Sequence, residues 1–178
     1  MSSPAAMEAQ VRAAPEIVDA VIAALQTEQG VHVETAVAAL GRLAGSSLFR
    51  TFGLPIEGME PGSPVFSDLA DEHGPALVEV LGAGLNSLGV RSDAPPAEGA
   101  NTEPAEPHLS FVESQRLLAG PVRAIGDRHA LDDDGLARAC ALATALLIQR
   151  AGAILAPQAA YQVAVYGFVE GTKTVPPG

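Results

Sequence analysis

Two short segments of the chain gather the histidine and carboxylate side chains that could do chemistry. In "SDLADEHG", Asp68 and Glu72 are four residues apart with His73 adjacent, so on a helix both carboxylates share one face. The second segment, "IGDRHALDDDG", contains Asp127 and His129. If the two segments meet in space, these five residues are weak candidates for a divalent-metal site or for proton transfer.

A structural explanation of the same segments needs no metal. Asp132, Asp133 and Asp134 precede an apolar stretch, where carboxylates cap free N–H groups and complement the helix dipole. The segment does not fit a calcium loop, because aligning Gly135 with the invariant glycine puts alanines at the first and last ligand positions. The chain also lacks the Glu-x-x-His motif of di-iron bundles. We therefore expect no cofactor, and the sequence leans towards a protein that is not an enzyme.

The single cysteine, Cys140, lies in the apolar run "ARACALATALL". One cysteine cannot form an internal disulfide, and no Cys/His spacing suggests zinc. We expect this side chain to be buried as a small hydrophobe and not to act as a nucleophile.

The C-terminal stretch "VYGFVEGTKTVPPG" contains Lys173, the only lysine of the chain. A cation just past a helix end is favoured by the helix dipole, but Glu170 is an acid at the same negative end. This conflict indicates that an arginine or a bound partner compensates Glu170. Tyr166 and Phe168 flank a glycine, and we expect both rings to pack into the end of the bundle, with residues 166–174 ordered and docked.

A predicted loop at residues 53–66 contains three prolines and three glycines. It also contains five large apolar residues, so it either folds over the core or meets a partner. Together with the C-terminal stretch it supplies the candidate interaction residues, which are Leu54, Ile56, Met59, Phe66, Tyr166, Phe168, Glu170 and Lys173.

Apolar residues recur with helical spacing along most of the chain, and no strand-like alternation of useful length occurs. Helices are predicted over residues 15–30, 33–51, 68–73, 75–88, 110–126, 132–155 and 157–171. The local signals for these bounds are Pro15 at a first helical position, Gly30 and Gly171 at helix ends, Ser67 as a cap, and a capping box of Ser110 and Glu113. Residues 136–155 are apolar nearly all round, which predicts a central, buried helix. Gly41 and Gly45 permit a neighbouring helix to approach closely. The predicted fold class is all-α, a compact bundle of about six or seven helices.

The domain organisation predicted from the sequence is a mobile tail at residues 1–14 followed by one all-helical domain at residues 15–178. Its halves, residues 15–90 and 108–178, are joined by an acidic, proline-rich linker at residues 91–107. This linker has no large apolar side chain to offset the entropy of ordering, so we expect it to be flexible.

The formal net charge of −11 bears on the possible partners. This charge disfavours nucleic acid and acidic membrane surfaces. The N-terminus lacks the basic and apolar regions of a secretory signal, and we expect a cytoplasmic protein. The small-residue helices and the apolar loop favour a protein that acts through protein contacts, as a homodimer. The alternative is a small enzyme or a ligand- or metal-binding protein that uses residues 68–73 and 127–134, and the sequence identifies no small-molecule ligand.

Overall fold

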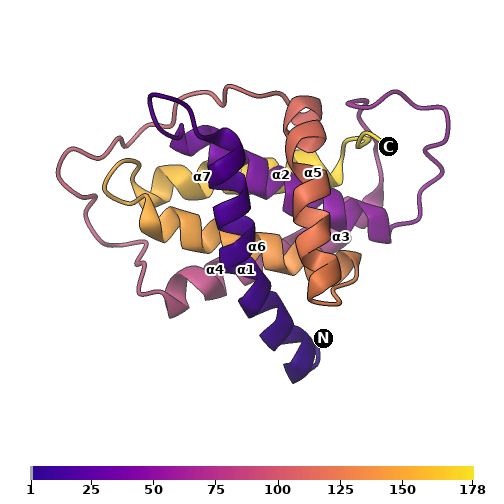
Figure 1. Cartoon of the computed structure of the whole chain (residues 1–178), viewed down its shortest axis with the longest axis horizontal. Coiled ribbons are helices and arrows are strands. Elements are labelled where there is room, and N and C mark those ends of the chain that lie inside the picture. Colours follow the sequence, from indigo (N-terminus) through magenta and orange to yellow (C-terminus); the bar gives the residue numbers. More distant parts are fainter. Residues whose placement is uncertain (1) are drawn as a thin grey trace.

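The computed structural model describes residues 2–178, and Met1, the first residue of the predicted tail, lies outside them. This part of the chain forms seven α-helices and no strand, with three isolated backbone bridges (Figure 1). None of these helices has the length and apolar character that a membrane span requires. The helices are α1 (Pro4–Leu25), α2 (Val33–Thr51), α3 (Asp68–His73), α4 (Pro75–Ser87), α5 (Phe111–Arg128), α6 (Asp133–Arg150) and α7 (Pro157–Thr172). The predicted all-α compact bundle is therefore confirmed.

Helix α2 is the most completely enclosed element of the bundle. Seventeen of its 19 residues are buried, and it packs against α5, α6 and α7. We predicted that residues 136–155 would form the central helix, but α6 stops at Arg150 and is less completely buried than α2. The difference arises because alanine, glycine and serine make up much of α2, so neighbouring helices can approach it from several sides.

Four glycines form the contact between α2 and α7. Gly41 and Gly45 on α2 face Gly167 and Gly171 on α7, and each pair is four residues apart. A Cβ atom placed on Gly45 would lie 2.5 Å from the carbonyl oxygen of Phe168, and one on Gly171 would lie 2.8 Å from the Cα atom of Gly45. The two backbones are therefore in direct contact, which only glycine permits.

The mobile tail predicted before Pro15 is wrong for the residues that the structure describes as α1. Helix α1 begins at Pro4, which occupies the first-turn position that we had assigned to Pro15. Ser3 caps this start by accepting a hydrogen bond from the N–H of Ala6 at 3.2 Å. Pro15 lies inside the helix, and the extra turns are held because Ala13 is fully buried against the core.

Two glycines that we expected at helix ends lie elsewhere. Helix α1 ends at Leu25, and Gly30 adopts a φ of +94° in the turn that follows. Gly171 lies inside α7, which continues to Thr172. Both glycines are required by the backbone, but neither one ends a helix. Gly30 is required by a turn, and Gly171 is required by the close contact with α2.

The predicted helix caps are present. Ser67 accepts a hydrogen bond from the N–H of Leu69, and the side chain of Asp132 accepts one from Gly135. Ser110 and Glu113 form a reciprocal capping box, with distances of 2.7 and 3.2 Å. The hydrogen bonds from Ser110 hold the pKa of Glu113 below its usual range.

The predicted linker contains no helix or strand, as expected, but its second part is attached to the bundle. The backbone of Asn101 exchanges two hydrogen bonds with the turn after α6, at 2.9 and 2.8 Å. Further along, the N–H groups of Ala105 and His108 donate to side chains at the start of α2. We call residues 101–109 the strap. Its attachment was not predicted, because the strap is held mainly through its backbone N–H and carbonyl groups. Hydrogen bonds of the backbone do not require particular side chains, so the sequence of the strap does not indicate them.

Candidate functional site

The end of α7 and the residues after it are docked, as predicted. The N–H of Val65 donates to the carbonyl of Lys173 at 2.7 Å, and the N–H of Val175 donates to the carbonyl of Ser63 at 2.9 Å. Val175 is only 3% exposed. The loop before α3 and the C-terminal residues are therefore joined by antiparallel backbone hydrogen bonds. Together they form one fixed end of the molecule.

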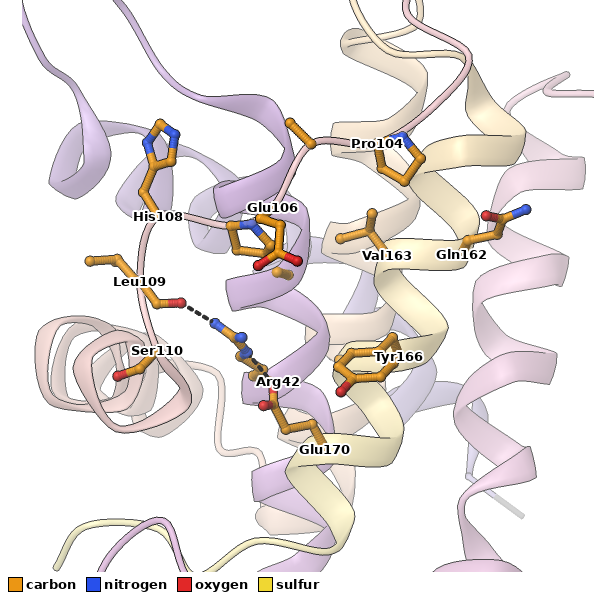
Figure 2. Close-up of a pocket in the computed structure, with 14 residues that line it drawn as sticks. Arg42, Pro104, Glu106, His108, Leu109, Ser110, Gln162, Val163, Tyr166 and Glu170 are labelled. Carbon is orange, nitrogen blue, oxygen red and sulfur yellow. Dashed lines mark hydrogen bonds and ion pairs between the residues drawn. The ribbon is translucent and has the colours of Figure 1, made fainter.

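Arg42 explains the acid at the negative end of α7. Its Nε donates to Glu170, so an arginine compensates this carboxylate, one of the two possibilities that we named. Its Nη1 donates to the carbonyl of Leu109 at 2.8 Å and approaches the hydroxyl of Ser114 at 3.4 Å (Figure 2). One buried guanidinium thus joins α2, α7, the strap and α5.

A pocket of about 560 Å³ lies between the strap and α7. Figure 2 shows its lining: Arg42 and Glu170 lie at one end, with Tyr166 and Gln162 along α7 and Glu106 projecting from the strap. The lining mixes one paired cation with carboxylates, an amide, a phenol, an imidazole and a hydroxyl. This arrangement suits polar contacts with a ligand. The side-chain hydrogen bonds among the lining residues are those of Arg42, and they do not pair a nucleophile with a general base.

The two aromatic rings that flank Gly167 have opposite environments. Phe168 is 2% exposed and belongs to the core. Tyr166 is 70% exposed, and the expectation that both rings pack into the bundle is wrong for this one. The two side chains separate because two residues along a helix place them about 200° apart around its axis.

A stacked pair of histidines holds the strap to the start of α2. The rings of His32 and His108 are 3.7 Å apart between centroids and nearly parallel, with 14° between their planes. The hydroxyl of Thr35 accepts the N–H of His108 at 2.9 Å and lies 2.7 Å from Nδ1 of His32. The carboxylate of Glu34 accepts the N–H of Ala105 at 3.2 Å. These side chains hold the chain's own strap against the start of α2.

A second hollow, of about 410 Å³, lies between α3, α4 and the end of α7, and we call it the C-terminal groove. Its apolar lining includes Val78, Phe168 and Val169. Lys173 lies at this groove and forms an ion pair with Asp71 at 2.7 Å. The only lysine therefore links the end of α7 to α3.

The apolar loop divides into a covered part and an exposed part. Leu54 and Ile56 are partly buried, whereas Met59 is 39% exposed. Phe66, just before α3, is 92% exposed, the largest value among the exposed large hydrophobic residues of the described chain. Of the loop's candidate interaction residues, Phe66 presents the most apolar surface.

The two histidine and carboxylate segments do not form a metal site. Among residues 2–178, no three histidine, cysteine or acidic side chains are grouped so that they could hold a metal ion. Asp68, Glu72 and Asp127 are exposed. His73 lies beside the ring of Phe52, at 5.9 Å between centroids.

His129 is engaged with α1. Its Nε2 lies 2.8 Å from a carboxylate oxygen of Glu16, and Arg128 donates to the other oxygen at 2.7 Å. These hydrogen bonds, first that of Arg128 and then that of His129, hold the pKa of Glu16 below its usual range. The second segment therefore ties the end of α5 to α1.

Cys140 is fully buried, as expected, and this burial raises the pKa of its thiol to about 12. A thiol with that pKa stays protonated at neutral pH and is a poor nucleophile.

Comparison of the chain with protein-family models, with curated proteins and with solved structures finds no match. Sequence reasoning missed Arg42 and the pair of His32 and His108. A buried arginine in the small-residue stretch of α2 was an available signal, because an unpaired charge there would be costly. The histidine stack had no comparable signal, since it depends on the path of the strap.

Proposed function

We propose that this protein functions through contacts with other protein surfaces, and that it associates with a second copy of itself. The observation that carries the proposal is Phe66, whose side chain is 92% exposed on a fixed backbone. The N–H of the preceding residue, Val65, donates to the carbonyl of Lys173, and the following residue, Ser67, caps α3.

A fixed, exposed aromatic ring is well suited to binding. Burying a phenylalanine side chain stabilises a complex by about 1.5–3 kcal/mol. Little of that gain is lost to ordering the backbone, because the residues on both sides of Phe66 are already held. Tyr166 and Val169, which are 70% and 48% exposed on α7, supply further contact area.

The charge balance supports a protein partner over nucleic acid. Of the ten basic side chains, seven form ion pairs with carboxylates of the same chain: Arg12, Arg42, Arg91, Arg128, Arg138, Arg150 and Lys173. Few cations remain for phosphate groups, and the net charge of −11 repels them. The same charge opposes association of two copies, so an apolar contact must drive it.

Sedimentation equilibrium over a range of micromolar concentrations tests the proposal. We expect the average mass of the chain to rise from 18.1 kDa towards twice that value as its concentration increases. A mass that stays at 18.1 kDa throughout would contradict self-association.

A further inference from the structure

The exposed ring of Phe66 and the C-terminal groove lie at the same end of the molecule. Val65 is hydrogen-bonded to Lys173, which lines the groove. Ser67 caps α3, which contributes Ala70 and Asp71 to the groove wall. Yet Phe66 is 92% exposed, so it does not occupy its own groove. One chain therefore displays an apolar projection and an apolar hollow side by side.

We infer that Phe66 of each chain inserts into the C-terminal groove of a second copy, in a two-fold symmetric pair. This inference rests on the proposed self-association and specifies its surface. In a two-fold interface the same patch is used twice, so a projection next to a matching hollow satisfies both copies at once. The groove volume of about 410 Å³ accommodates a phenyl ring, and Val78, Phe168 and Val169 supply apolar walls.

A stable pair requires more contact area than the two rings alone supply. Standard interfaces bury about 800 Å² on each partner, which is roughly a tenth of the 9114 Å² surface of this chain. An aromatic ring buries about 150–250 Å² and covers a comparable area of its hollow. The exchange of two rings would therefore form the apolar centre, and the surfaces of α3, α4 and α7 around the groove would complete the contact.

The rim of the groove predicts how salt acts on the pair. Asp71 and Glu79 lie at the groove, and Asp68 and Glu72 are exposed on α3. Lys173 neutralises only Asp71. Two copies that meet here bring like charges together, so high salt should strengthen their association. A basic partner protein at the same surface would show the opposite salt dependence.

Site-directed cross-linking tests this geometry without altering the ring or the apolar walls. Asp68→Cys places a thiol next to Phe66, and Glu79→Cys places one on the groove of a separately prepared chain. Both positions are exposed, and the native Cys140 is buried. After mixing the two chains with a short thiol cross-linker, we expect mass spectrometry to find position 68 of one chain linked to position 79 of the other. Adding Phe66→Ala to both chains should remove most of this link. Because Phe66 is nearly fully exposed, that variant should keep the wild-type circular dichroism spectrum and melting temperature.

The control replaces Asp68→Cys with Val11→Cys, since Val11 is a 56% exposed apolar residue on α1. The inference would be overturned if position 79 were linked to position 11 in preference to position 68. It would also be overturned if the Phe66→Ala chains still formed a dimer. Either result would leave self-association intact. Association that weakens at high salt would also overturn it, in favour of a contact driven by charge. A wild-type chain that is monomeric by sedimentation would remove the proposed function and this inference together.

Discussion

At the scale of single residues, the contact between α2 and α7 depends on the absence of four side chains. Gly45 has no room for a side chain, because a Cβ atom there would meet two backbone atoms of α7 within 2.8 Å. We predict that Gly45→Ala lowers the free energy of unfolding by about 1–3 kcal/mol, since backbone atoms cannot rotate away as a side chain can. Urea denaturation monitored by circular dichroism measures this change.

The matched control for that variant is Gly82→Ala. Gly82 lies in α4, and an added Cβ atom would meet nothing within 4 Å. This substitution should stabilise the fold by about 0.4–1 kcal/mol, because alanine restricts the unfolded chain. If Gly45→Ala proved as harmless as Gly82→Ala, the direct backbone contact would be disproved.

Glu16 gives a residue-scale prediction about pH. Its pKa is lowered from 4.5 in the folded chain by the hydrogen bonds of Arg128 and His129. Its contribution to stability is therefore complete above pH 4.5 and is lost as the pH falls through the lower, folded pKa. Glu16→Gln should be less stable than the wild type at neutral pH, and the two should converge in acid. Thermal melts across this range would show a constant difference if Glu16 did not titrate in this way.

Several residue-scale features could be predicted from the sequence because their causes are local. The capping box of Ser110 and Glu113 depends on neighbouring residues only, and the apolar run around Cys140 was enough to indicate that this residue is buried. The acid at the end of α7 also indicated a missing cation, since Glu170 opposes the helix dipole. The identity of that cation was beyond reach, because Arg42 is 128 residues away along the chain.

At the scale of elements, the strap is held by a few side chains at the start of α2. Thr35→Val keeps the shape of this buried residue but removes the acceptor for the N–H of His108. Loss of a buried hydrogen bond costs about 1 kcal/mol or more, so we predict that amide hydrogen exchange in residues 101–109 accelerates about tenfold. Thr144→Val is the control, because that hydroxyl bonds only within α6. Equal exchange in the two variants would show that Thr35 does not hold the strap.

The last element is needed for cooperative folding. Truncation after Ala164 removes Gly167, Phe168 and Gly171, which pack against α2 or into the core. We predict that this chain loses its cooperative thermal transition, whereas truncation after Val175 retains it. Melts of the two chains followed by circular dichroism provide the comparison, and a sharp transition in the shorter chain would refute the prediction.

Most elements could be predicted from the sequence, and the failures share one cause. The starts of α2, α3, α4 and α7 agree with the prediction because serine caps, prolines and apolar spacing act locally. The start of α1 was misplaced because Pro4 and Pro15 give the same local signal, and only packing against the core distinguishes them. The attachment of the strap and the central place of α2 likewise depend on contacts between distant segments.

At the scale of the whole molecule, an acidic bundle presents one fixed aromatic ring beside an apolar groove. The sequence drew attention to Phe66 and to the end of α7, but it could not place them at one end of the molecule. That arrangement needs α3, α4, α7 and the preceding loop to assemble, as the pairing of residues 63–65 with 173–175 shows. We therefore expect two copies of the chain to associate through this end of the molecule.

The measurement that tests this expectation most directly is the light-scattering mass of the 178-residue chain at micromolar concentration, in low and in high salt. We predict a mass approaching twice 18.1 kDa, with the larger dimer fraction at high salt because screening reduces repulsion between two copies of charge −11. A mass of 18.1 kDa under both conditions would contradict it.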